Sequence, residues 1–276
     1  MRTMKIALTQ MDIAWENKAK NLEKAETLIQ KAAAAGADMI IFPEMSFTGF
    51  SMDIEAIAEK VNEVQAGAAI TDTVREIQKL SCKYPLVIVF GYVRLPEGSE
   101  KVQGMGINCL AAAEKGRVIM QYDKIHPFSY GGEEKHYISG TSITGCEIQG
   151  VPFGCFICYD LRFPEIFQIS SQKNKVIIVI ANWSWERIAH WKLLLQARAV
   201  ENQCYILGVN RTGPGNGLYF EPSSMAFDPY GELISKETAG EILFATVDME
   251  VVDRYRSQFP LKQDRRPELY GRYYSE

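Results

Sequence analysis

Two short runs of the chain, Val87–Phe90 and Val176–Ile180, are apolar at every position. A strand with one face in water alternates apolar and polar residues, whereas a continuous apolar run of this length suits a strand buried on both faces. The sequence therefore predicts the α/β class, with helices covering a sheet. The pattern fits both a doubly wound sheet and two sheets packed face to face with helices outside.

Periodicity and turn residues predict the remaining elements. The expected strands are Lys5–Gln10, Asp38–Phe42, Leu86–Val93, Gly106–Ala113, Arg117–Tyr122, Phe153–Ile157, Val176–Ala181, Tyr205–Val209, Ser224–Phe227 and Ile242–Asp248. The expected helices are Asn17–Ala35, Ile54–Val64, Asp72–Cys82, one starting near Pro164, and Ile188–Asn202. No linker, charge block or repeat interrupts residues 1–276, so we expect a single domain. A charged, tyrosine-rich tail from about residue 253 is expected on the surface or against a partner subunit.

Composition excludes several classes of protein. The net charge is 30 − 34 = −4, which argues against nucleic-acid binding because that needs a basic patch. No apolar run approaches the roughly 18 residues of a membrane helix, and the N-terminus lacks the apolar core of a signal peptide. The six cysteines are too few for a disulfide scaffold. We therefore expect a cytoplasmic protein with reduced thiols and no membrane partner.

Cys158 stands where an apolar strand ends and a turn precedes a helical pattern. A tight turn there exposes the sulfur, and the following backbone N–H groups favour a thiolate over a thiol. Most free cysteines are simply buried packing residues. The polar cluster Asp160, Arg162 and Glu165 directly after Cys158 favours a functional cysteine instead.

Cys155 and Cys158 also form a Cys-x-x-Cys spacing, which is an alternative redox or metal pair. Residues three apart on a strand point to opposite faces, so the two thiols would meet only in a turn. No second Cys-x-x-Cys completes a four-thiolate zinc site. We expect Cys155 to be a core residue and no metal to be bound.

Glu44 and Lys124 also follow apolar strands directly. A single charged residue in that position is usually solvated. A glutamate, a lysine and a cysteine that all follow strands are a different case, because sites in α/β proteins assemble at the carboxyl ends of strands. We expect the three side chains to share one site.

The motifs around these residues are FPEMSFTGF with Glu44, YDKIHPF with Lys124 and CYDLRFPE with Cys158. Together they resemble the nitrilase superfamily of carbon–nitrogen hydrolases, which use a Glu–Lys–Cys triad, and their order and spacing fit as well. ANW at 181–183 and GVNR at 208–211 extend the resemblance, which covers about Met4 to Tyr270. The family implies a four-layer α-β-β-α sandwich, a homodimer or higher homo-oligomer, and no cofactor or metal.

The resemblance also implies roles for individual residues. Cys158 would be the nucleophile and Glu44 the general base, while Lys124 and the backbone N–H of Tyr159 would stabilise the oxyanion. Members carry a second glutamate seven residues before a glycine, and Glu133 precedes Gly140 by seven, so we choose it over Glu134.

Other side chains are assigned by position along the chain. Trp183 and Phe50 would line the substrate pocket, although core packing explains them equally well. Arg187 and Lys192 are candidates for binding a substrate carboxylate, and both could equally be solvated.

Further charged residues have structural explanations. Asp160 and Arg162 are expected to form an ion pair behind the nucleophile, and Arg198 and Glu201 a helical salt bridge. The family mechanism runs without histidine, so no catalytic role falls to His126 or His136.

The segments around Glu44 and Cys158 look like the branch that contains ω-amidases, which hydrolyse the terminal amide of 2-oxoglutaramate or 2-oxosuccinamate. We therefore expect an amidase acting on a small carboxylated amide. The alternatives are an N-carbamoyl amine or amino acid hydrolase, a nitrilase, a non-catalytic interaction subunit and a thiol–disulfide protein.

Overall fold

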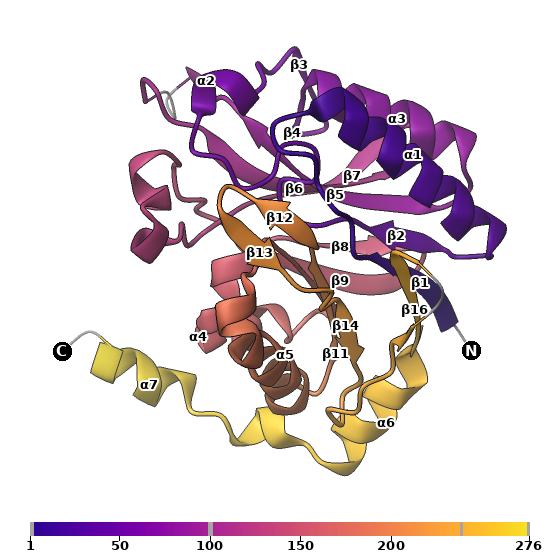
Figure 1. Ribbon diagram of the computed structural model, residues 1–276. Helices are drawn as coiled ribbons and strands as arrows, with labels where there is room; N and C mark the ends of the chain where they lie inside the picture. The colour runs from indigo at the N-terminus through magenta and orange to yellow at the C-terminus, as the bar shows by residue number, and fades with distance from the viewer. Residues whose placement is uncertain (1–2, 99–101, 238–239, 275–276) are drawn as a thin grey trace.

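The computed structural model describes residues 3–98, 102–237 and 240–274. Two β-sheets pack face to face, and helices cover the outer face of each (Figure 1). The layers therefore run helix, sheet, sheet, helix within one domain. This confirms the predicted α-β-β-α sandwich and decides between the two arrangements that the apolar runs left open.

Within the described residues, the larger sheet has seven strands in the order β15-β16-β1-β2-β5-β6-β7. β1, β2 and β5 pair in parallel, and the other neighbours are antiparallel. The strands are β1 (Thr3–Thr9), β2 (Met39–Ile41), β5 (Val87–Arg94), β6 (Ile107–Glu114), β7 (Arg117–Asp123), β15 (Lys236–Glu237) and β16 (Ile242–Asp248).

The smaller sheet has the order β14-β11-β10-β9-β8. β9, β10 and β11 pair in parallel, so their carboxyl ends meet at one edge. The strands are β8 (Gly145–Ile148), β9 (Val151–Ile157), β10 (Val176–Ala181), β11 (Tyr205–Asn210) and β14 (Met225–Phe227).

Helices cover both sheets (Figure 1). Their bounds are α1 (Lys18–Ala34), α2 (Ile54–Ile57), α3 (Asp72–Lys83), α4 (Pro164–Ser170), α5 (Ile188–Asn202), α6 (Met249–Gln258) and α7 (Pro267–Tyr274). α1 and α3 pack on the larger sheet, and α4 and α5 pack on the smaller one. Among the described helices, none is long and apolar enough to cross a membrane.

The apolar run in β5 is explained by what covers its two faces. Val87 and Val89 belong to the core between the two sheets. Ile88 and Phe90 belong to the core under α1 and α3. Because side chains alternate between faces along a strand, both sets must be apolar when both faces are buried.

The helix predicted at Ile54–Val64 is wrong beyond Ile57. Asp53 caps α2, but Ala58 is already extended, with ψ at 139°. The chain then bridges to the end of β5, where the backbone N–H of Glu59 donates to the carbonyl of Val93 at 3.1 Å. The segment therefore forms this bridge to β5 in place of the helix that its periodicity predicts, because tertiary contacts override helix propensity.

Short elements were not predicted at all. They are β8, β15 and two small hairpins, β3 (Glu63–Gln65) with β4 (Ala68–Ile70), and β12 (Gly213–Gly215) with β13 (Leu218–Phe220). By contrast, the helix at Ile188–Asn202 and the strands at Val176–Ala181 and Ile242–Asp248 have the predicted bounds.

The tail beyond β16 forms α6 and α7 and reaches along the smaller sheet's helical layer (Figure 1). The Tyr274 hydroxyl donates to Glu165 at 2.9 Å, on an exposed surface. Contact of this tail with a partner subunit stays a prediction.

Gly91 in β5 lies directly against the segment that follows β2. A Cβ at position 91 would lie 2.4 Å from the backbone nitrogen of Met45 and 2.8 Å from Cα of Glu44. We predict that Gly91→Ala lowers the free energy of unfolding by about 1–3 kcal/mol, because the backbone of that segment must shift. Urea denaturation measures the change.

The matched control is Gly271→Ala in α7, where an added Cβ would meet no heavy atom within 4 Å. We expect its stability to stay the same or rise slightly, because alanine favours the helix. Equal stability of Gly91→Ala and wild type would contradict the close approach.

Candidate active site

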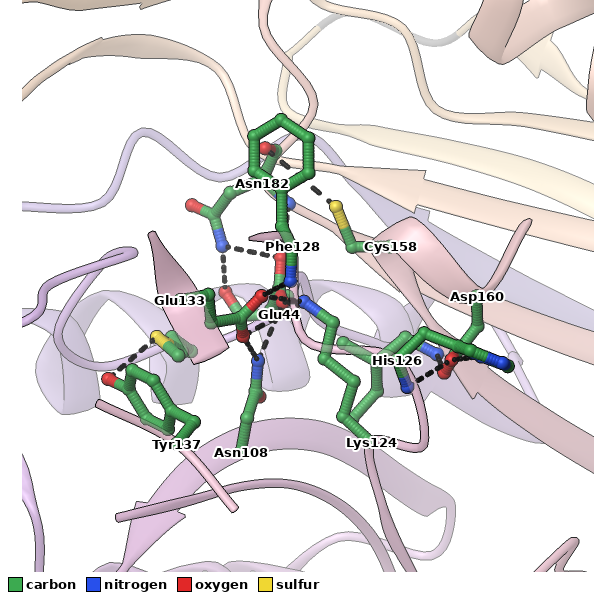
Figure 2. A network of polar contacts seen from close by, with 12 residues as sticks. Glu44, Asn108, Lys124, His126, Phe128, Glu133, Tyr137, Cys158, Asp160 and Asn182 are labelled. Carbon is green, nitrogen blue, oxygen red and sulfur yellow. Dashed lines mark hydrogen bonds and ion pairs between the residues drawn. The ribbon is translucent and has the colours of Figure 1, made fainter. Parts of the chain in front are cut away.

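Glu44 lies completely buried just after β2. Its Oε1 accepts hydrogen bonds from Lys124 Nζ at 2.9 Å and from Asn108 Nδ2 at 2.7 Å (Figure 2). Its Oε2 accepts the backbone N–H of Asn182 at 2.8 Å. Asn182 follows β10 and Lys124 follows β7, so strands of both sheets deliver the partners of this carboxylate.

Lys124 is 1% exposed and is fixed through its backbone as well as its side chain. Its N–H donates to Asn108 O at 2.9 Å, and its carbonyl accepts the N–H of Gly140 at 2.7 Å. Burial acts to lower the pKa of Lys124, but the carboxylates of Glu133 and Glu44 outweigh it, so the pKa is raised well above its usual value. Lys124 therefore stays an ammonium.

Glu133 supplies the second carboxylate to this network. It starts a short 3₁₀ turn after Gly132, which has a left-handed backbone. Its Oε2 accepts Lys124 Nζ at 2.7 Å and also the backbone N–H of Phe128. Glu134 next to it is exposed. The structure thus brings Glu133, and not Glu134, to Glu44 and Lys124.

Two carboxylates and one ammonium are buried together, so the ionised cluster carries a net charge of −1. Burial and the negative charge of Glu44 raise the pKa of Glu133, and Lys124 opposes the rise. Because its net charge is −1, the cluster can accept a proton on a carboxylate without creating a new isolated charge. It is suited to general acid–base chemistry.

Cys158 follows β9 and has a left-handed backbone, with φ at 48°. Its Sγ lies 4.0 Å from the carbonyl oxygen of Asn182 (Figure 2). A residue other than glycine held in this conformation costs about 1–3 kcal/mol, and such strain gathers at functional positions. The turn directs the thiol toward the chain after β10.

The expected thiolate is not supported. Burial, together with the charges of Glu44 and Glu133, raises the pKa of Cys158 well above its usual value, and Lys124 only partly opposes this. A short 3₁₀ turn, Cys158–Arg162, follows the cysteine. The raised pKa favours a neutral thiol over a thiolate, and a neutral thiol needs a base in order to react.

The expected ion pair between Asp160 and Arg162 is wrong. Asp160 is fully buried and accepts four hydrogen bonds: from the Tyr122 hydroxyl at 2.7 Å, the N–H of Ile157 at 3.0 Å, and the N–H and Nδ1 of His126 at 3.0 and 2.8 Å. These donors occupy both oxygens. Asp160 thereby ties the turn of the cysteine to the segment after Lys124.

Arg162 instead turns toward a cavity and lies over the Trp183 ring at 4.8 Å. The ion pairs seen in the described ranges do not include Arg162. The predicted salt bridge between Arg198 and Glu201 is confirmed, at 3.0 Å. Arg198 also donates to the carbonyl of Leu161.

A cavity of about 470 Å³, including its open mouth, lies beside Cys158. Its lining residues are Phe50, Phe128, Cys158, Tyr159, Arg162, Asn182, Trp183, Ser184, Arg187, Leu218 and Phe220. The structure thus places every expected pocket residue but one, since Lys192 is exposed on α5 away from the cavity.

Several lining residues were missed from the sequence. Leu218 and Phe220 reach the cavity from the hairpin of β12 and β13. The Gly-Asn-Gly at 215–217 is a turn signal that could have revealed this hairpin. Asn182 lies in the ANW motif at 181–183, although no role was assigned to it. Asn108, which belongs to the buried network and not to the lining, gave no signal, because an isolated asparagine near a strand is commonplace.

The remaining candidates lie apart from the network. Cys155 is fully buried in β9, and all six cysteines are free thiols. His126 stacks on Phe163 at 3.7 Å, and His136 is half-buried. In the part of the chain that is described, no group of three or more His, Cys, Asp or Glu side chains is arranged to hold a metal ion.

Sequence comparisons agree on one family. The family profile described as "Carbon-nitrogen hydrolase" matches residues 5–257. The chain is 32% identical to the 2-oxoglutaramate amidase of Bacillus subtilis, over 96% of this chain and 98% of that protein. It is 30% identical to the omega-amidase YafV of Escherichia coli (strain K12), over 96% of this chain and 97% of that protein.

Solved structures agree in fold. Nit3 of Saccharomyces cerevisiae, a member of branch 10 of the nitrilase superfamily, aligns with a TM-score of 0.85 at 26% identity, covering 96% of this chain and 97% of that chain. XC1258 of Xanthomonas campestris, a CN-hydrolase superfamily protein, aligns with a TM-score of 0.83 at 27% identity, covering 96% and 98%. The chain therefore belongs to the carbon–nitrogen hydrolase family of the nitrilase superfamily.

Proposed function

We propose that this carbon–nitrogen hydrolase is an ω-amidase-type enzyme that cleaves the terminal amide of a small carboxylated substrate through a thioester on Cys158. One observation carries the proposal. Cys158, whose backbone conformation is left-handed, lines a cavity beside a buried cluster of charged side chains. The cluster consists of Glu44, Lys124 and Glu133. Two arginines, Arg162 and Arg187, line the same cavity.

In the first half-reaction the Cys158 sulfur attacks the carbonyl carbon of the amide. Glu44 takes the thiol proton, and a tetrahedral intermediate forms. The same proton passes from Glu44 to the amide nitrogen, the C–N bond breaks and ammonia leaves. A thioester remains on the sulfur. The neutral resting thiol makes this base essential.

In the second half-reaction a water molecule attacks the thioester carbonyl. Glu44 takes a proton from the water, and the C–S bond breaks when the second intermediate collapses. The proton returns to the sulfur, and the product is the free carboxylic acid. The sum is one amide and one water converted to one acid and one ammonia.

Lys124 and the backbone N–H of Tyr159 are the proposed donors to the oxyanion. Lys124 is suited to this role because it stays charged and is held rigidly by two carboxylates. Glu133 would orient the ammonium through its two hydrogen bonds to Nζ, at 3.0 and 2.7 Å.

The arginines support a carboxylated substrate. Arg187 lies over the rings of Phe128 and Tyr130, at 5.6 and 5.9 Å, and donates to Ser184 Oγ at 3.1 Å. Arg162 lies over Trp183. Arg187 Nη1 also lies 3.7 Å from Glu186 Oε2, and Arg162 Nη2 lies 3.5 Å from His190 Nδ1. Because a guanidinium carries five N–H donors, each arginine has further donors for a substrate carboxylate. The names of the amidases of similar sequence agree with such a substrate.

The alternatives differ in their products. An N-carbamoyl hydrolase releases carbon dioxide as well as ammonia, and a nitrilase converts nitriles. A panel of ω-amides of oxo acids, N-carbamoyl amino acids and nitriles, with both gases measured, separates them. Turnover confined to carbamoyl compounds or nitriles would contradict the proposal, and no turnover at all would favour an interaction subunit.

A homodimer or higher homo-oligomer stays a prediction from the resemblance, and a cytoplasmic location stays a prediction from the composition. Ile169 on α4 and Leu193 and Val200 on α5 are exposed apolar side chains on the outer helical layer. A second copy of the chain would cover such a surface.

We predict that Cys158→Ala lowers kcat for the preferred amide by at least about 10³-fold, because the covalent route is lost. Ammonia release in steady state measures the effect. Cys155→Ala is the matched control and should keep most of the activity, since that thiol is buried in β9. Loss of activity only in the Cys155 variant would instead support a thiol–disulfide mechanism.

We predict that Arg187→Ala and Arg162→Ala each raise KM for a carboxylated amide by roughly 10- to 100-fold, the effect of losing a charged hydrogen-bond partner. The KM for a neutral amide of the same chain length should change little. Lys192→Ala, on the exposed side of α5, is the control. An equal rise in KM for the carboxylated and the neutral amide would argue against recognition of the carboxylate by these arginines.

A further inference from the structure

Asn108 lies at the centre of the buried network, yet the mechanism above gives it no role. It belongs to β6 and is 1% exposed. Its Nδ2 donates to Glu44 Oε1 at 2.7 Å and to Glu133 Oε1 at 3.0 Å (Figure 2). One amide therefore bridges both carboxylates.

Lys124 bridges the same pair. Its Nζ donates to Glu44 Oε1 at 2.9 Å and to both oxygens of Glu133. The two carboxylates are thus joined by two donors, one charged and one neutral. Two carboxylates in one site resist being ionised together, so each donor that they share favours the doubly ionised state.

The orientation of the amide also points to a special role. Oδ1 of Asn108 is buried and accepts no hydrogen bond from the described residues. An unpaired buried carbonyl destabilises the fold. Turning the amide over would place that oxygen against two carboxylates, so the orientation is fixed by the network. Oδ1 stays unpaired in the orientation in which the NH₂ group donates to both carboxylates.

The other titratable groups around the pair are few. Cys158 faces it from the turn after β9, and its pKa is raised by burial and by both carboxylates. Tyr137 lies on the far side and donates to the carbonyl of Ser51. Its pKa is raised by burial and by the same two carboxylates. Neither group donates a hydrogen bond to Glu44 or Glu133 in the described structure.

We propose that Asn108 is a positioning residue, a neutral bridge that keeps Glu44 and Glu133 ionised together and holds Glu44 ready to take the proton of Cys158. This rests on the proposed function, in which Glu44 is the base. The hydrogen bonds of Asn108 Nδ2 go to Glu44 and Glu133, so it acts through the carboxylates and not through the substrate.

The sign of the effect follows from the contacts. Removing the amide takes away a donor to the ionised form of the pair, so the pKa of the pair rises. The doubly ionised form of the pair is then reached only at higher pH. The acid limb of the pH profile of kcat/KM must therefore move upward.

The experiment compares pH profiles of wild type, Asn108→Ala and Asn108→Asp on the preferred amide. We expect Asn108→Ala to move the acid limb up by about one pH unit, the size of one hydrogen bond to a charged group. Asn108→Asp keeps the shape but replaces the donor with another acid, so its limb should move further. KM should stay within about twofold of wild type in both variants.

Leu110→Ala is the control for a merely structural effect. Leu110 lies two residues along the same strand, in the core between the sheets. Its loss should lower the thermal midpoint and leave the acid limb in place. If the Asn108→Ala chain does not fold, the near-isosteric Asn108→Asp carries the test alone.

An acid limb at the wild-type position in the Asn108 variants would overturn the inference, even if the rate fell. A different result would contradict the proposed function, namely turnover that is retained in Cys158→Ala. Loss of turnover in Cys158→Ala together with unmoved limbs in the Asn108 variants would overturn the role of Asn108 alone.

Discussion

One ammonium group between two buried carboxylates is the interaction on which the site depends. Lys124, Glu44 and Glu133 are each 1% exposed or less. Charges buried in this way are tolerated only when they are paired and fully hydrogen-bonded. The pairing requires the ends of β2 and β7 and the turn of Glu133 to converge, with β10 supplying Asn182 from the other sheet. β2 and β7 belong to the same sheet, and the face-to-face packing of the two sheets brings Asn182 to Glu44.

The same cluster also acts on the pKa of the cysteine. A nearby lysine would favour a thiolate, but burial and two carboxylates prevail and raise the pKa of Cys158. In the proposed mechanism, reactivity therefore comes from the base Glu44 acting on a neutral thiol and from a turn that places Cys158 in the lining of the cavity. Asp160 couples the two halves of this arrangement, because its hydrogen bonds join the segment after Lys124 to the turn of Cys158.

Much of this was accessible from the sequence because the relevant signals are local. Fully apolar strands such as Val176–Ala181 predict burial on both faces. Glu44, Lys124 and Cys158 each come shortly after a strand, although the strand before Lys124, Arg117–Asp123, is only partly apolar. The hairpin of β12 and β13 has a local turn signal at 215–217, but its place beside the cavity was not accessible. The bridging role of Asn108 was not accessible either, because both arise from contacts distant in sequence. The wrong helix beyond Ile57 and the wrong Asp160–Arg162 ion pair have the same origin. In both cases the groups form hydrogen bonds with residues that are distant in sequence: the backbone of Glu59 with Val93, and the carboxylate of Asp160 with Tyr122 and His126.

The central claim is that Cys158 carries the acyl group of the substrate. Rapid acid quenching of the wild-type enzyme during turnover of a carboxylated ω-amide, followed by mass spectrometry of its peptides, tests this directly. We predict an adduct equal to the substrate minus ammonia on the peptide that contains Cys158. An adduct on any other residue, or a pre-steady-state burst of ammonia with no adduct on that peptide, would contradict the account.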